Sequence, residues 1–326
     1  MNVRLSAQLL AGRPAGDPVA VAERLLAVQA QDLRGARLAI RARTQGLTAA
    51  DIDRALTLDR SLVVTWLNRG TLHLVRSEDY GWLHALTTPQ LLTGNARRLA
   101  QEGVPPDDAN RGVALVERAL ADEGPLTRFE LRNRLREANV RTEGQALVHI
   151  LMLACLRGIA LRGPIVGRQH AYVLVRDWLG PPRPVARDQA LVELARRYLR
   201  GHGPADDRDL AKWAGITLGD ARAALEAADP VPPRRGSPTA LPKLLGPFDP
   251  LLLGWASREA VVGQHESSVI SGGLFRPVAL VEGRVAGTWS LANGHPELRP
   301  LRRLTRAEQA ALDAEAADVV RFLSDA

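Results

Sequence analysis

The chain has 326 residues and a formal net charge of +7, so it is long enough for two or three domains with cores of their own and favours an acidic partner. Its single cysteine, Cys155, excludes an intrachain disulfide and a cysteine-based metal site, and this usage is typical of a reducing cytoplasm. Since no apolar run reaches about 18 residues, we expect neither a signal peptide nor a membrane-spanning helix, and we expect a cytoplasmic, nucleoid-associated protein.

The first predicted amphipathic helix begins after Asp17 and Pro18, an N-cap followed by proline in the first turn. Its apolar pattern continues to the triplet Gln29-Ala30-Gln31, which is predicted to end the helix. Helix ends that need only a polar residue usually have Lys, Arg, Gly or Asn there. Two glutamines at this place therefore suggest a second role, although exposed glutamines with good helix propensity are the alternative.

A short helix capped by Thr48 and a β-hairpin over residues 62–75 are predicted next. The hairpin turns at Asn68-Arg69-Gly70. Helix, helix and hairpin is the element order of a winged helix-turn-helix, so residues 1–95 are predicted to form a first domain of this type.

Thr71 and His73 lie two residues apart in the second strand of this hairpin, so their side chains are expected on one face. His73 either contacts a substrate or is a hydrogen-bonded strand histidine, and the pattern alone does not choose between these roles.

The same element order recurs over residues 96–180. One helix is predicted to stop at Gly124, the next is capped by Thr127 with Glu130 three residues later, and a third precedes two strands around a turn containing Gly-Pro. Residues 181–240 are predicted to hold three further helices and end in the proline-rich "DPVPPRRGSP", a linker or wing.

The last segment, residues 241–326, differs in kind. Short strands are predicted from "LLGPFDPLLLGW" to "LRPLRRL", with Glu282-Gly283 as a hairpin turn and a closing helix behind them. The predicted fold is therefore mainly α with β hairpins (α+β): three tandem winged helix-turn-helix domains and a small C-terminal β-rich module.

Arginines concentrate between residues 157 and 200. These 44 residues include nine arginines and three acidic residues, so the segment has a net charge of +6. A concentrated basic segment is typical of a phosphate-binding surface, and Arg162 and Arg168 are the contacts we expect. The alternative is a solvated surface in a protein whose arginine content reflects a GC-rich genome.

Several catalytic patterns are absent from the sequence. It contains no glycine-rich phosphate loop, no His-Glu-x-x-His, and no histidines at metal-ligand spacing, which argues against a kinase, a dehydrogenase or a zinc hydrolase. We expect neither a metal nor a cofactor. Tandem winged helices alone would suggest a transcriptional regulator that binds DNA without catalysis.

Four segments carry a more specific resemblance: "LLAVQAQDLRGARLAIRAR", "TWLNRGTLHLVRSEDYGWL", "GPFDPLLLGW" and "RPVALVEGRVAGTW". In this order, and over nearly the whole chain, they resemble the AlkZ/YcaQ family of bacterial DNA glycosylases, which are built from tandem winged-helix domains. The resemblance implies that Gln29 and Gln31 are the catalytic pair, in the AlkZ-like Gln-x-Gln form. Separately, we expect DNA contacts from the hairpin residues Arg69, Thr71 and His73.

Asp32 lies one residue outside the register of the acidic YcaQ-like form of this motif. It is expected to be a surface residue, because a helix C-terminus disfavours an anion, and activation of a water molecule is the alternative role.

The uncharged pair Gln29 and Gln31 is chemically suited to a damaged base that already carries a positive charge. A purine alkylated at N7 or N3 leaves without protonation, so oriented carboxamides suffice to position water and stabilise the developing sugar cation. We therefore expect a monofunctional, monomeric DNA glycosylase acting on double-stranded DNA and on cationic alkylpurines, bulky adducts or interstrand crosslinks included, in repair or self-resistance.

The chain is poor in aromatic residues, and Trp66, Tyr80 and Trp82 are the ones nearest the motif and the hairpin in sequence. An aromatic sandwich for a flipped base is hard to build from them. We expect Gln29 and Gln31 to lie in a wide groove between winged-helix domains that reads the lesion in place.

Overall fold

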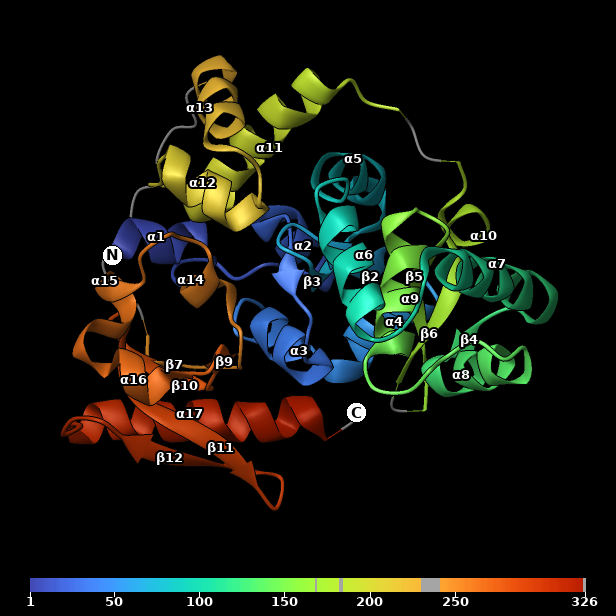
Figure 1. Ribbon diagram of the computed structural model, residues 1–326. Helices are drawn as coiled ribbons and strands as arrows, with labels where there is room; N and C mark the ends of the chain where they lie inside the picture. Colours follow the sequence, from blue (N-terminus) through green and yellow to red (C-terminus); the bar gives the residue numbers. More distant parts are fainter. Residues whose placement is uncertain (168, 182–183, 230–240, 325–326) are drawn as a thin grey trace. The chain divides into compact units, whose positions relative to one another are not determined.

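The computed structural model describes residues 1–167, 169–181, 184–229 and 241–324, and the chain divides into two compact units (Figure 1). The first unit joins Met1–Ile52 to Leu191–Ala326, and the second is Asp53–Ala190. The expected mixture of helices and short strands is confirmed. Among the described residues, no helix combines the length and apolar character needed to cross a membrane.

The first unit begins with three helices and one short strand. Asp17 caps the second helix by accepting a 2.7 Å hydrogen bond from the backbone N–H of Ala20, as its sequence position predicts. This helix ends at Leu25, so the prediction that it continues through Gln31 is wrong. The elements are α1 (Asn2–Ala7), α2 (Pro18–Leu25), β1 (Val28–Gln29), α3 (Leu33–Arg41) and the start of α4 (Ala49–Thr57).

The unit continues with the three helices predicted after residue 181. Thr217 caps the third of them with a 3.0 Å hydrogen bond from the N–H of Asp220. Most of the proline-rich segment expected as a linker or wing lies outside the described residues. The helices are α11 (Arg187–His202), which belongs to this unit from residue 191 on, α12 (Asp207–Ala214) and α13 (Leu218–Ala227).

A four-stranded antiparallel sheet in the order β12-β11-β10-β7 completes the unit. The turn at Glu282 and Gly283 is confirmed, with φ of 52° and 77°. Figure 1 shows the long α17 lying along this sheet. The elements are β7 (Lys243–Leu245), α14 (Pro250–Leu253), α15 (Glu259–Val262), η1 (Gly263–His265), α16 (Glu266–Val269), β8 (Ile270–Ser271), β9 (Leu274–Phe275), β10 (Val278–Val281), β11 (Arg284–Ala292), β12 (His295–Pro300) and α17 (Arg306–Leu323).

In the segment "LLGPFDPLLLGW" only Leu244 and Leu245 lie in a strand, and a turn and a short helix follow, so the expectation of strands there is only partly right. Asp249 caps α14 by accepting from the N–H of Leu251 at 2.9 Å, and Pro250 occupies the first helical position. A Cβ on Gly246 would lie 2.8 Å from the Cβ of Leu38 in α3, so this glycine permits close approach of the turn to the helix.

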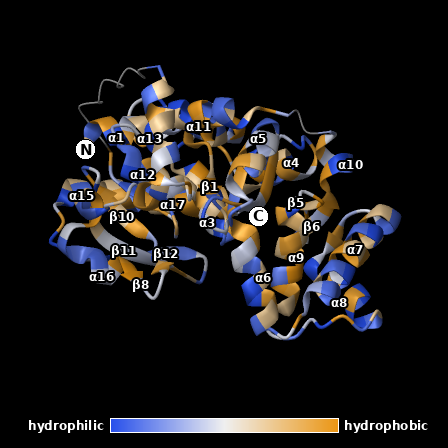
Figure 2. Cartoon of the chain, turned by 45° about the horizontal axis from the view of Figure 1, so that its top comes forward, coloured by the Kyte–Doolittle hydropathy of each residue, from blue (hydrophilic) through white to orange (hydrophobic). Residues whose placement is uncertain are grey.

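The second unit contains a sheet in the order β3-β2-β5-β6-β4 and a layer of helices. The central α9 packs against α6, α7, β2 and β5, and nearly all of its side chains are buried, in keeping with its hydrophobic colouring in Figure 2. The elements are the rest of α4, β2 (Leu62–Leu67), β3 (Thr71–Arg76), α5 (Ser77–Thr87), α6 (Leu91–Gln101), α7 (Pro106–Glu123), β4 (Leu126–Thr127), α8 (Arg128–Glu137), α9 (Ala146–Leu156), β5 (Ala160–Val166), β6 (Gln169–Leu174) and α10 (Val175–Leu179).

Local signals in this unit were read correctly from the sequence. Gly124 ends α7 at φ 83°, and Thr127 and Glu130 form a capping box at the start of α8. The Gly163-Pro164 pair, however, lies inside β5 and not in the turn, which is a correction. The pairing register of β5 with β6 shifts between Arg162 and Ile165. Proline has no N–H to donate to the neighbouring strand, and a β-bulge at this place accommodates the proline within the strand.

Candidate functional site

A one-residue turn leads from α2 into the glutamine motif. Leu26 has φ 65° and ψ −43°, and the N–H of Ala27 donates a 2.8 Å hydrogen bond to the carbonyl of Leu25. This is a γ-turn of the positive-φ type, which is rare and costs on the order of 1–3 kcal/mol for a residue with a side chain. The Leu26 side chain is completely buried, so its packing holds the strained backbone in place.

The two candidate catalytic glutamines differ in exposure. Gln29 lies in β1 with 8% of its surface exposed, in a run where Val28 and Ala30 are also buried. Gln31 follows in a bend and is exposed. The motif thus combines a buried carboxamide in an apolar segment with a solvent-accessible one two residues later, and it belongs to an extended segment and not to a helix end.

Asp32 is the N-cap of α3, where its carboxylate accepts a 2.9 Å hydrogen bond from the N–H of Arg34. The expectation of a helix C-terminus here is wrong, and the helix dipole at an N-terminus stabilises the anion. The carboxylate is exposed and holds the helix end. This geometry gives Asp32 a structural role as a helix-capping residue at the surface.

The hairpin that carries the other candidate residues forms as predicted. Thr65 pairs with His73 and Leu67 with Thr71, so these residues share one face of the sheet. Asn68 and Gly70 have φ of 53° and 83° in the turn, where Arg69 is exposed.

His73 is a buried, neutral imidazole. Burial in the first place, and the nearby charge of Arg69 in the second, lower its pKa to about 3. Its Nδ1 lies 3.0 Å from the carbonyl oxygen of Thr71, so Nδ1 carries the proton and donates, and Nε2 remains an acceptor. At neutral pH this side chain supplies hydrogen bonding and shape, with no positive charge for acid catalysis.

Two further polar residues of the hairpin were missed in the sequence. Thr65 is fully buried and Asn68 is 1% exposed, yet the hydroxyl of Thr65 and both side-chain polar atoms of Asn68 have no hydrogen-bond partner among the described residues. The hydroxyl of Thr71 is in the same situation. Buried polar atoms are nearly always paired, so water or a ligand is the expected partner. The sequence signal that could have identified them is the presence of two polar residues in a strand segment whose other residues are mostly β-branched or aromatic.

In its described residues, the arginine-rich stretch does not form one patch of unpaired cations. Arg162 is half-buried, with its guanidinium 4.9 Å from the ring centre of Trp66 and 3.1 Å, through Nε, from the hydroxyl of Tyr172. Arg176 pairs with Glu117, and Arg168 lies outside the described residues. The stretch also runs from the second unit into the first.

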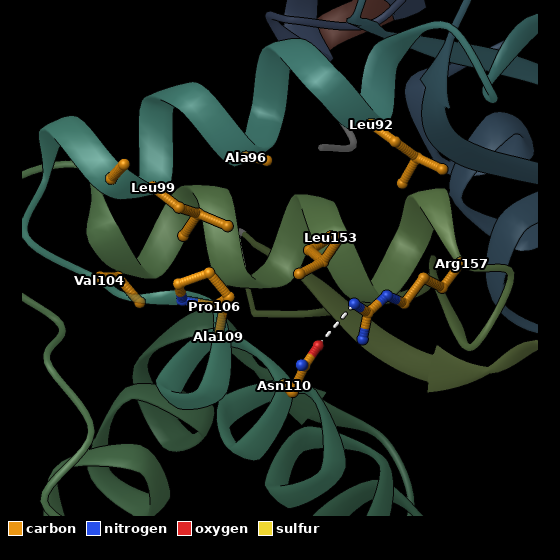
Figure 3. A pocket seen from close by; sticks show the side chains of 10 residues that line it. Leu92, Ala96, Leu99, Val104, Pro106, Ala109, Asn110, Leu153 and Arg157 are labelled. Atoms are coloured by element: carbon orange, nitrogen blue, oxygen red, sulfur yellow. Dashed lines mark hydrogen bonds between the residues drawn. The ribbon is translucent and has the colours of Figure 1, made fainter.

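Arg157, at the start of this stretch, lines an apolar cavity of about 340 Å³ in the second unit (Figure 3). Its Nη2 donates a 2.7 Å hydrogen bond to Oδ1 of Asn110, at one end of the cavity. The rest of the wall comes from aliphatic side chains of α6, α7 and α9, among them Leu92, Leu99 and Leu153.

The aromatic residues near the hairpin are engaged in packing. Trp66 and Tyr80 are buried, and Nε1 of the half-buried Trp82 donates to Oδ1 of Asp79 at 3.2 Å. In the described part of the chain, no group of three or more His, Cys, Asp or Glu side chains is arranged to hold a metal ion.

Comparisons with known proteins agree with one another. The profile of the DNA glycosylase AlkZ-like family matches residues 22–322. An interstrand DNA cross-link repair glycosylase of Streptomyces sahachiroi is 28% identical over 362 residues, which cover 98% of this chain and 94% of the relative. The solved structure of Streptomyces sahachiroi DNA glycosylase AlkZ is similar with a TM-score of 0.76 and 25% identity, over 98% of this chain and 95% of that one.

Proposed function

Because the chain belongs to the AlkZ-like DNA glycosylase family, we propose that it hydrolyses the N-glycosidic bond of purines alkylated at N7 or N3 in double-stranded DNA. Membership in a glycosylase family favours an enzyme over a winged-helix regulator without catalysis. The observation that carries the proposal is the Gln29-Ala30-Gln31 motif, in which one carboxamide is held in an apolar segment next to an exposed one.

The chemistry follows from the charge of the lesion. Alkylation at N7 or N3 makes the purine a cationic leaving group, so the bond to C1′ breaks without a strong acid. The carboxamide oxygens of Gln29 and Gln31 orient the attacking water and stabilise the oxocarbenium-like sugar by their dipoles. A neutral His73 fits this scheme, because the reaction needs no proton donor to the base.

A monofunctional reaction is part of the proposal. A bifunctional glycosylase that cleaves the strand needs an amine nucleophile. Both lysines of the chain are engaged: Nζ of Lys212 donates to the carbonyl of Ala256 at 2.9 Å, and Nζ of Lys243 lies 2.8 Å from Glu315. This supports water as the nucleophile.

We propose that bulky adducts and interstrand crosslinks are accepted, read in an open groove without base flipping. Two facts support this: the relative from Streptomyces sahachiroi is named for cross-link repair, and Trp66, Tyr80 and Trp82 are occupied by packing. DNA contacts are assigned to Arg69, His73, Arg162 and Arg168, and to the hydroxyl of Thr71, which has no hydrogen-bond partner among the described residues. We further propose a monomer with three winged-helix domains, 1–95, 96–180 and 181–240, and a β-rich module, 241–326.

The proposal is tested with duplex oligonucleotides that carry a single N7-methylguanine or an N7-linked crosslink. After incubation, heat or alkali cleaves the strand at an abasic site. Strand cleavage at the lesion is expected after incubation with the wild type, but not after incubation with Gln29→Ala/Gln31→Ala. A footprint without cleavage would show binding alone and return the regulator as the better assignment.

A further inference from the structure

Helix α8 of the second unit carries a row of arginines that have no ion-pair or hydrogen-bond partner among the described side chains. Arg128, Arg132 and Arg136 are spaced four residues apart, so they lie along one side of the helix over about 12 Å. All three are exposed, and none has an ion pair or a side-chain hydrogen bond to any described residue. We call these three residues the α8 arginine row.

Arg134, between them in sequence, behaves differently. It lies 2.7 Å from Glu123 and 3.8 Å from Glu137, and its Nε donates to Glu123 at 2.8 Å. The charge of Arg134 is therefore neutralised by carboxylates of the protein itself, whereas the positive charges of the α8 arginine row are available to an external anion.

A pocket of about 300 Å³ lies at the N-terminal part of the row. It is lined by Arg128, Phe129, Arg132, Thr142, Glu143 and Gln169 among others. Phe129 is 63% exposed, which is unusual for a phenylalanine. Thr142 is 4% exposed, and its buried hydroxyl has no hydrogen-bond partner among the described residues.

The acidic groups nearby leave the pocket positive. The carboxylate of Glu143 accepts from the N–H of Thr142 at 3.1 Å, and the carboxylate of Glu130 accepts from the N–H and hydroxyl of Thr127, each at 2.7 Å. Of these two acids only Glu143 lines the pocket, where it faces two arginines.

We propose that the α8 arginine row binds the phosphodiester backbone of duplex DNA, with a phosphate between Arg128 and Arg132 and the Phe129 ring against the adjoining sugar. The guanidinium fork matches two phosphate oxygens, and the spread of the row covers more than one phosphate. Gln169, at the start of β6, adds an uncharged donor to the same pocket. This inference rests on the proposed function, which makes DNA the substrate.

The test compares Arg132→Gln with Arg134→Gln, two substitutions that remove the same charge from the same helix. Affinity for an undamaged duplex is measured by fluorescence anisotropy over a series of salt concentrations. For Arg132→Gln the slope of log affinity against log salt should flatten by about 0.9, the value for one lost phosphate contact on duplex DNA. For Arg134→Gln the slope should equal that of the wild type.

Phe129→Ala supplies a second readout. It should weaken binding at every salt concentration and leave the slope unchanged, since it removes an apolar contact and no counterion is released. Arg132 and Phe129 are exposed, and Arg134 is paired at the surface, so each variant should fold, and circular dichroism is used to check this.

Equal slopes for Arg132→Gln and the wild type would overturn the inference, as would equal flattening in the two arginine variants, which indicates net charge without a site. Either result leaves the proposed function intact if the wild type excises N7-methylguanine. Failure of the wild type to excise the base overturns the proposed function, whatever the slopes are.

Discussion

Arg43 and Asp249, 206 residues apart in the chain, form a completely buried ion pair with two 2.8 Å hydrogen bonds, Nη1 to Oδ2 and Nη2 to Oδ1. Neither side chain is exposed at all. Arg43 also donates to the carbonyls of Gln8 at 2.9 Å and Ala39 at 2.8 Å, and Asp249 caps α14. The pair thus joins two of the family-like segments, "LLAVQAQDLRGARLAIRAR", which contains the glutamine motif and ends at Arg43, and "GPFDPLLLGW".

The first prediction concerns this pair. Arg43→Met or Asp249→Leu alone should lower the free energy of unfolding by about 3–5 kcal/mol, because each leaves a charge buried without its counterion. The double variant should recover a large part of the loss. Urea denaturation measures all three. A loss below about 1 kcal/mol in the single variants would contradict the prediction.

The second prediction concerns the glutamines. Gln29→Ala and Gln31→Ala should each slow excision of N7-methylguanine by about 10- to 1000-fold, the range for losing one preorganised polar group, with DNA affinity nearly intact. Single-turnover kinetics measures the rate. Gln45→Ala, the same change at an exposed glutamine of the first unit, is the matched control and should keep the wild-type rate. Wild-type rates in the double variant would remove these residues from the mechanism.

The third prediction concerns His73. Since burial lowers its pKa to about 3, its imidazole should show no titration between pH 5 and 8 in NMR spectra. His73→Ala should reduce excision by less than either glutamine change, because the side chain positions neighbours and transfers no proton. A titration near the ordinary histidine pKa, matched by the pH profile of excision, would instead make it a proton donor.

The fourth prediction concerns acid stability. His202 is fully buried, stacked on Tyr198 with ring centres 4.7 Å apart, and burial lowers its pKa to about 3. Above about pH 6.5 the imidazole of His202 is neutral in both the folded and the unfolded state. Below it the unfolded state binds a proton that the folded state does not bind until about pH 3, so His202 by itself should lower stability by about 1.4 kcal/mol per pH unit across this window.

His202→Phe should remove this contribution and make the first unit less sensitive to acid. Thermal unfolding at several pH values between 3 and 7 measures it. If the larger ring does not fit, the wild-type imidazole resonance is the alternative measurement, and protonation near pH 6 in the folded protein would disprove the assignment.

Features encoded within a few residues could be predicted from the sequence. The capping box at Thr127 and the hairpin turn at Asn68 to Gly70 appear as expected, because each depends on hydrogen bonds or backbone angles between close neighbours. The glutamine motif could likewise be recognised from its residue types, whereas its conformation was predicted wrongly as a helix end.

Only the tertiary structure decided what surrounds these elements. Helix α2 has an apolar pattern that would allow it to continue, yet burial of Leu26 stabilises a strained turn and places Gln29 in a strand. The roles of the arginines could not be predicted from the sequence either: Arg162 stacks on Trp66 and Arg43 pairs with Asp249, whereas the α8 row has no partner in the part of the chain that the structure describes. The sequence determined the local elements and the family, because those depend on neighbours along the chain. Burial and the pairing of charges depend on residues that meet only after folding, so the structure alone decided them.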